Sequence, residues 1–168
     1  MRHSGWMRRN LLDDLQAEIN GLWAKAGLGA CIPIARERQD NGSPHVEVRA
    51  GRYDIVVTER GSETKRIAGL SRFDAARWFV FGMAQAHAQS AELKSRRAPE
   101  DAPPLASGLK DDGYSRWNWM APTIATMQRI APDLGKWAEQ DFQGVLDRYP
   151  LTDSEKRNAR YHLPSVNK

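Results

Sequence analysis

Residues 53–61 read Tyr-Asp-Ile-Val-Val-Thr-Glu-Arg-Gly, and this stretch decides the fold. It is rich in β-branched residues and runs into the turn pair Gly61-Ser62, which is typical of a strand. Residues 45–49 alternate before it, and residues 64–67 continue after it. Because the connections at Ala50-Gly51 and Gly61-Ser62 are short, the three segments are predicted to form an antiparallel meander.

A fourth strand is expected at the edge of this sheet. Ile32 and Ile34 alternate around Pro33, and a proline within a strand is found mainly at a sheet edge. Residues 40–44, Asp-Asn-Gly-Ser-Pro, are predicted to form the turn that leads into the next strand. The sequence therefore indicates three to four strands.

Helical periodicity flanks the sheet on both sides. Residues 6–25 place apolar side chains on one helical face and end before Gly27 and Gly29. A long helix starts at Ser71, with Asp74 three residues on as a variant of the capping box. The apolar faces predicted for these helices are Leu11, Leu15, Ile19 and Leu22 in the first, and Phe73, Ala76, Val80, Met83, His87 and Ala91 in the second.

Three more helices are expected towards the C-terminus. One covers residues 115–130, and the next is opened by Pro132 and carries Tyr149 at the end of its apolar face. Thr152 and Glu155 form a capping box for a short last helix. The sequence thus predicts an α+β fold, with an N-terminal helix, an antiparallel meander of three to four strands and then four helices packed on the sheet, in a single domain of residues 1–168.

Charge is distributed unevenly around a long proline-rich loop at residues 98–113. Residues 71–97 carry five basic and two acidic side chains, whereas residues 98–115 carry Lys110 against four carboxylates. Those carboxylates belong to Glu100, Asp101, Asp111 and Asp112. A basic helix therefore runs into an acidic loop, and loops of this length are often functional.

The bulk composition favours a soluble protein of a reducing compartment. The net charge is +4, from 25 basic and 21 acidic residues, which is a mild bias. No apolar segment resembles a secretion signal or a membrane span. Cys31 is the one cysteine and is expected to be a small buried side chain. We therefore expect a cytoplasmic location and no membrane association.

A search for catalytic chemistry returns little. The four histidines, His3, His45, His87 and His162, lie too far apart for a helical metal motif, and His87 is predicted to be a core histidine. Glu59 and Glu63 flank a hairpin turn and could serve as an acid/base pair, but we favour the simpler interpretation, charged side chains on a solvated hairpin end. We expect no catalytic residue, no metal, no cofactor and no enzymatic activity.

Aromatic residues are more informative. The chain has six tryptophans, and Trp117 and Trp119 point to different sides of one helix because they are two residues apart. Together with Tyr114 and Arg116 they place residue types that are enriched in interfaces just after the acidic loop.

Tyr53 to Gly61 resembles the strand-and-turn signature of immunity protein family 63, from bacterial polymorphic toxin and contact-dependent growth inhibition systems. That signature is an aromatic residue, a β-branched strand and then Ser/Thr-Glu-Arg-Gly. In the family a charged strand and an aromatic-rich helix follow, as residues 63–66 and the helix from Phe73 do here. A proline-opened helix that closes on a proline and acidic residues comes last, and residues 132–153 are similar to it.

The resemblance implies an immunity protein that binds and neutralises a cognate bacterial toxin domain by stoichiometric occlusion. The acidic loop could occupy the positively charged groove of a nuclease toxin. The candidate toxin-binding residues are Glu100, Asp101, Asp111, Asp112, Tyr114, Arg116, Trp117 and Trp119, with Glu59, Arg60 and Glu63 as a secondary surface. Two other functions stay open: a nucleic-acid-associated binding module, and a small enzyme that uses Glu59 and Glu63. We expect no specific nucleic acid partner.

Overall fold

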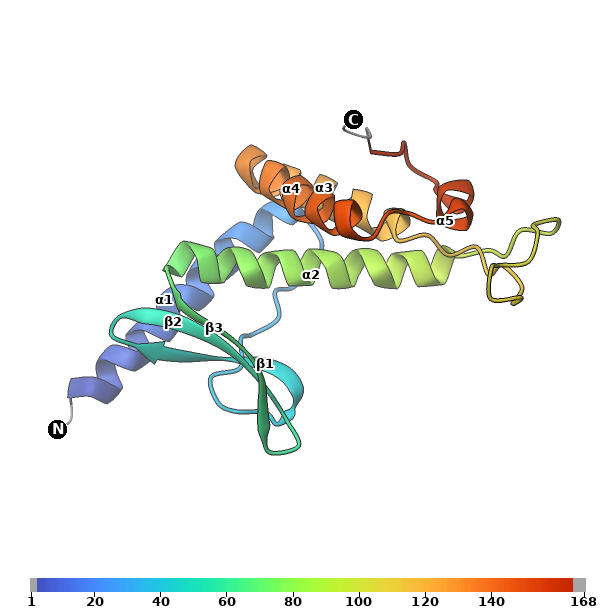
Figure 1. Cartoon of the computed structure of the whole chain (residues 1–168). Helices are drawn as coiled ribbons and strands as arrows, with labels where there is room; N and C mark the ends of the chain where they lie inside the picture. The colour runs from blue at the N-terminus through green and yellow to red at the C-terminus, as the bar shows by residue number, and fades with distance from the viewer. Residues whose placement is uncertain (1–2, 165–168) are drawn as a thin grey trace. The chain divides into compact units, whose positions relative to one another are not determined.

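The computed structural model describes residues 3–164, with side chains from residue 10 onward (Figure 1). The side chains of His3 and Trp6 lie outside the described residues. The chain forms two compact units, residues 1–80 and 81–168, and each is described by itself. An N-terminal helix, a three-stranded antiparallel sheet and four further helices follow one another, which confirms the predicted α+β class and element order. The single domain, and the packing of the last helices on the sheet, stay predictions.

The first unit contains helix α1 (His3–Ala26) and strands β1 (Asn41–Arg49), β2 (Arg52–Glu59) and β3 (Ser62–Leu70). The strands lie in the order β1-β2-β3, as a meander requires. Both connections are two-residue turns with positive φ at each central residue, 47° and 74° at Ala50-Gly51 and 49° and 84° at Arg60-Gly61. This pattern is that of type I′ turns, whose twist matches the twist of the flanking strands.

One face of the sheet shares the core of the first unit with α1. Val46 and Ile55 are cross-strand partners and are almost fully buried, as are Leu15 and Ile19 on the helix. The Tyr53 hydroxyl donates a hydrogen bond of 2.9 Å to the Leu11 carbonyl. The predicted helical face is rotated slightly, because Leu12 and Trp23 are buried whereas Leu11 and Leu22 are only half-buried.

The expected fourth strand is absent from the described part of the chain. Residues 32–34 are irregular, Ile32 is 67% exposed, and one isolated parallel bridge joins Ala35 to His45. The reason is a side-chain contact, since the Gln16 side chain accepts a hydrogen bond from the Ile34 amide. Cys31, expected to be buried, is half-buried.

The predicted turn at residues 40–44 is also wrong. Residues 41–44 are instead the start of β1, with a register shift between Asn41 and Pro44. Positive φ angles at Asp40 (56°) and Gly42 (83°) bend the chain into the strand, so turn-forming residues here produce a bulged strand start.

Helix α2 (Arg72–Ser95) runs from the first unit into the second. Its start matches the prediction, because the Ser71 hydroxyl accepts from the Asp74 amide and donates to the Asp74 carboxylate. Its buried positions recur every four residues, as Ala76, Val80, Ala84 and Ala88. His87 is exposed, which contradicts its prediction as a core histidine, because the buried stripe passes one residue further along.

The second unit adds α3 (Trp117–Ile130), α4 (Pro132–Arg148) and α5 (Asp153–Asn158). Helices α3 and α4 pack together around a cluster of buried residues, namely Trp117, Met120, Phe142, Leu146 and Leu151. Pro132 opens α4 and the Thr152–Glu155 capping box opens α5, both as predicted. Tyr149 is 67% exposed and is not part of the apolar face, because α4 ends at Arg148. No helix in the described residues has the length and apolarity to span a bilayer.

Ala50 gives a test of the meander. A non-glycine residue other than asparagine or aspartate is strained at its φ of 47°. We expect Ala50→Asn to raise the free energy of unfolding by about 0.5–1 kcal/mol, because asparagine is favoured in type I′ turns. Urea unfolding measures this change. An unchanged or lower value would contradict the turn geometry.

Candidate functional site

The loop at residues 98–113 leaves the end of α2 and returns to α3 within the second unit (Figure 1). Its tip is closed by two backbone hydrogen bonds: the Leu105 amide donates to Leu109 (2.9 Å) and the Gly108 amide donates to Leu105 (2.8 Å). Gly108 has a φ of 79°, which glycine adopts without strain. The tip is therefore a compact turn.

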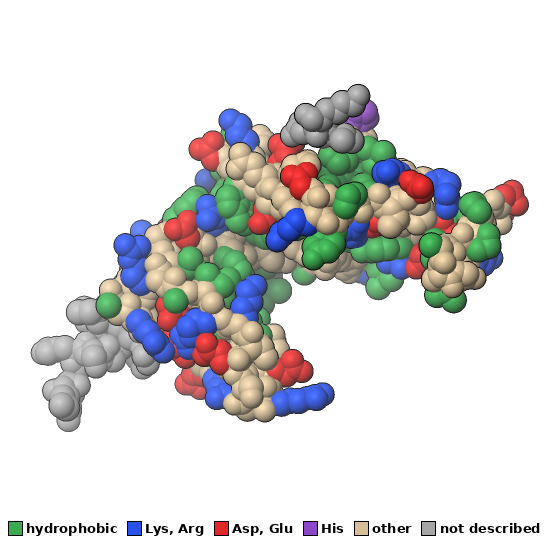
Figure 2. All heavy atoms as spheres, in the orientation of Figure 1, with side chains coloured by type: hydrophobic (Ala, Val, Ile, Leu, Met, Phe, Trp, Pro, Cys, Tyr) green, Lys and Arg blue, Asp and Glu red, His purple; other side chains and the backbone are tan. Residues whose placement is uncertain are grey.

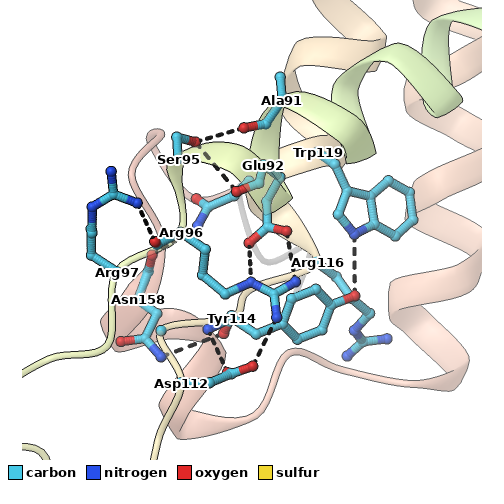
Figure 3. Close-up of polar contacts among 12 residues, drawn as sticks. Ala91, Glu92, Ser95, Arg96, Arg97, Asp112, Tyr114, Arg116, Trp119 and Asn158 are labelled. Carbon is cyan, nitrogen blue, oxygen red and sulfur yellow. Dashed lines mark hydrogen bonds and ion pairs between the residues drawn. The ribbon is translucent and has the colours of Figure 1, made fainter.

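Arg96 is the first residue after α2 and binds the base of the loop. Its guanidinium donates two hydrogen bonds to Glu92 (3.0 and 2.8 Å) and one to Asp112 (2.8 Å). Glu92 is only 3% exposed, so its charge needs this partner. The hydrogen bonds that Arg96 donates to Glu92, with the charge of Asp112, raise the pKa of Arg96 above its usual range. Figure 3 shows Arg96 between the two carboxylates.

Tyr114 connects this ion pair to α3. The Arg96 guanidinium carbon lies 4.7 Å from the centre of the Tyr114 ring, within range of a cation–π interaction. The Tyr114 hydroxyl accepts a hydrogen bond of 3.2 Å from the Trp119 indole nitrogen, and the Tyr114 amide donates to Asp112 (Figure 3). One continuous set of contacts thus joins the end of α2 to the first turn of α3.

Asp111 fixes the returning arm of the loop from inside the protein. It is 2% exposed and accepts hydrogen bonds from the Gly113 amide (2.9 Å), Asn158 (2.7 Å) and Arg157 (3.1 Å). The Gly113 hydrogen bond, together with those from Asn158 and Arg157, lowers the pKa of Asp111 below its ordinary value. Gly113 itself has a φ of 83°, and a Cβ there would overlap the Arg97 carbonyl oxygen.

Arg116 binds the α4–α5 connection. Its guanidinium donates to Glu155 (2.6 and 2.9 Å) and to the carbonyls of Tyr149 and Pro150. Burial alone would raise the pKa of Glu155, but hydrogen bonds from Arg116 and from the Thr152 amide outweigh it and lower the pKa. Glu155 also completes the capping box of α5, so this pair fixes where α3 starts relative to α5.

The predicted toxin-binding residues therefore separate into two groups. Glu100 and Asp101 are exposed and form no ion pair with any described residue. The others hold the loop or the α3–α4 core: Asp111, Asp112, Tyr114 and Arg116 through the contacts above, Trp117 by burial and a hydrogen bond to His162, and Trp119 by packing on Phe142. A role for any of them in toxin binding stays a prediction.

Sequence reasoning missed the partners of these residues. Arg157 and Asn158 lie 46 and 47 positions from Asp111, which they bind, and nothing in their local pattern marks them. Glu92 and Arg96 are four residues apart, a spacing at which side chains on a helix can pair, and this signal was available. Sequence reasoning also missed Leu109, which is 67% exposed beside the loop tip. An apolar residue between Gly108 and Lys110 was the available signal.

The secondary surface does not bring its carboxylates together. Glu63 lies opposite Thr58 in the β2–β3 register, and Glu59 follows Thr58, so the two glutamates point to opposite faces of the sheet. Arg66 binds Glu63 through two hydrogen bonds of 2.9 and 2.8 Å, and these lower the pKa of Glu63. Arg60 is exposed in the turn between β2 and β3.

Other candidate sites are sparse in the described part of the chain. No group of three or more His, Cys, Asp or Glu side chains there could hold a metal ion. A groove of about 540 Å³ runs along α3 and α4, floored by Trp117, Phe142 and Leu146 and walled on one side by residues 162–164. This floor belongs to the α3–α4 core.

Comparisons with protein-family models, with curated proteins and with solved structures gave no match to this chain. The resemblance to immunity protein family 63 therefore rests on the order of its motifs alone.

Gly113 is predicted to be indispensable for the base of the loop. Gly113→Ala should destabilise the protein more than Gly108→Ala, because both residues have positive φ but only Gly113 has a backbone atom in the way. The Gly108 change should cost about 1–2 kcal/mol, the strain of an alanine in this conformation. Urea unfolding compares the two variants. Equal losses would show that the Arg97 carbonyl does not constrain the loop.

Acid should weaken the second unit through Glu155. Its folded pKa lies below the usual 4.5, so the stability that it contributes is complete above that pH and is lost as pH falls through the folded pKa. Glu155→Gln should lower stability at neutral pH and flatten the decline of the unfolding free energy below about pH 4.5. Urea unfolding from pH 7 to 3 measures both, and the exposed Glu139→Gln controls for the loss of one charge. A wild-type acid slope in Glu155→Gln would contradict this assignment.

Proposed function

We propose that this protein is an immunity protein that binds a cognate bacterial toxin domain in the cytoplasm and neutralises it by stoichiometric occlusion. The observation that supports the proposal is that the loop at residues 98–113 has a fixed base and an exposed apolar residue beside its tip. Its base is fixed by Arg96, Asp111 and Gly113, while its tip leaves Leu109 exposed. This is how a recognition element is expected to be built, because binding residues commonly lie on loops positioned by a rigid scaffold.

A loop held at its base binds at a lower entropic cost than a free one. Ordering a flexible segment on binding consumes part of the interaction free energy. Here Pro99, Pro103 and Pro104 restrict the backbone, and the Leu105–Leu109 turn is closed by hydrogen bonds before any partner arrives. The loop can therefore enter a cleft of the toxin largely in its free conformation.

Charge supports a partner with a positive surface. Glu100 and Asp101 keep their charges unpaired on the outgoing arm of the loop. Exposed carboxylates speed association with a basic surface, and the substrate groove of a nuclease is such a surface. A nuclease toxin is accordingly the class that we favour for the partner.

The sequence resemblance supplies the second line of support. The family-like motif Tyr53 to Gly61 forms β2 and the turn after it, and the charged stretch at residues 63–66 lies in β3. The aromatic-rich segment lies in α2, and the proline-opened segment is α4. The motifs thus coincide with successive elements of the fold.

The family resemblance implies that the toxin is encoded beside this protein, as the C-terminal domain of a larger secreted protein. Co-expression with the C-terminal domain encoded by the neighbouring gene therefore tests the proposal. The wild type should restore growth, and replacing residues 101–110 by a short Gly-Ser linker should abolish rescue, because the base contacts remain and only the projecting part is lost. Circular dichroism and urea unfolding check that this variant is folded. The double variant Glu59→Ala/Glu63→Ala should still protect. Full rescue by the folded linker variant would place the contact elsewhere.

Binding to nucleic acid distinguishes the main alternative. We expect only weak, nonspecific association with DNA or RNA at physiological salt, with dissociation constants no tighter than about 10⁻⁶ M. Much tighter, sequence-dependent binding would favour the nucleic-acid-associated module over the immunity protein.

A further inference from the structure

We infer that Leu109 is the anchor of the loop, and that the partner receives it in an apolar pocket whose rim is positively charged on the side facing Glu100 and Asp101. This inference rests on the proposed function and adds the chemistry of the partner's surface. It begins from the exposure of Leu109, whose side chain is 67% accessible although the backbone on both sides of it is fixed.

Hydrogen bonds fix the backbone at Leu109 itself and two residues after it. Its carbonyl accepts the hydrogen bond from Leu105 that closes the tip. Two residues further on, Asp111 is buried and bound by Asn158 and Arg157. The leucine is therefore presented to solvent at a defined position, and binding orders its side chain but little of the backbone.

The free charge of the loop differs from the charge that the sequence suggests. Asp111 is buried and paired with Arg157, whereas Asp112 is exposed and shares Arg96 with the buried Glu92. The exposed loop residues that form no ion pair with a described residue are Glu100 and Asp101 on the outgoing arm and Lys110 next to Leu109. The contact is thus centred on an apolar side chain, with negative charge to one side. Figure 2 shows both hydrophobic side chains and carboxylates on the surface of this projecting segment.

Leu93 provides a matched comparison within the same unit. It is 66% exposed, almost the same as Leu109, but it lies on the regular surface of α2 rather than on a projecting turn. A difference between the two leucines in binding would therefore report position and not exposed apolar area.

The test uses purified wild type and the C-terminal domain encoded by the neighbouring gene, with binding measured by surface plasmon resonance. Leu109→Ser should weaken binding roughly 10- to 100-fold, the factor that corresponds to the free energy of burying a leucine side chain. The loss should come mainly from faster dissociation. Leu93→Ser should bind like wild type, and Leu109→Met, which keeps the volume, should stay within about threefold of it.

The charged rim is tested with the double variant Glu100→Gln/Asp101→Asn. Its association rate should fall and should depend less on salt than that of wild type. The control Glu139→Gln/Asp141→Asn, which changes two exposed carboxylates on α4, should leave both the rate and its salt dependence unchanged.

If wild type binds and Leu109→Ser binds as tightly as Leu93→Ser, Leu109 is not the anchor, while the proposed function stands. If wild type binds but the rim variant keeps its rate and salt dependence, the charged rim is wrong. If wild type neither binds nor protects, the proposed function fails and this inference fails with it.

Discussion

Burying a carboxylate requires a positive partner, and this constraint shapes both units of the protein. Four carboxylates are buried among the described residues, and an arginine binds each of them. The pairs are Asp54 with Arg66, Glu92 with Arg96, Asp111 with Arg157 and Glu155 with Arg116. Removing one partner of such a pair costs about 3–5 kcal/mol, because an uncompensated charge is left behind. Arginine suits the task, since its planar fork can bind a second acceptor at the same time.

That second acceptor is what positions the loop. Arg96 is held by Glu92 on the helix and still reaches Asp112 and the ring of Tyr114. In the first unit Arg66 does the same, because it binds Asp54 on the neighbouring strand and also Glu47 and Glu63. Each of these arginines thus neutralises one buried carboxylate and, through its other contacts, connects two segments of the chain. The candidate recognition loop is one outcome of that local rule.

The sequence allowed the elements to be predicted but not the contacts between them. Period-two alternation in β1, the β-branched residues of β2 and the capping residues Thr152 and Glu155 are local signals. The meander and the start of α5 could therefore be found from the residues alone. The strand expected at Ile32–Ile34 failed because a distant side chain, Gln16, took the Ile34 amide.

The loop shows the same limit. Its length and prolines were visible in the sequence, and so was the count of four carboxylates. Which of these carboxylates form ion pairs was not visible, because Arg157 lies 46 residues from Asp111 and Arg96 lies 16 residues from Asp112. A charge count treats all four alike, although Asp111 is buried against Arg157 and Asp112 shares Arg96 with Glu92.

The same pairing bears on the choice between a protein and a nucleic acid as the partner. The segment at residues 71–97 is basic by composition, but three of its five cations are bound to carboxylates. Arg72 lies 3.4 Å from Glu18, Arg77 lies 3.1 Å from Asp74, and Arg96 is held as described above. Binding to nucleic acid gains free energy when a free cation displaces condensed counterions from phosphate, and an arginine already paired with a carboxylate must first give up that partner. The basic helix therefore offers a polyanion fewer unpaired cations than its composition implies.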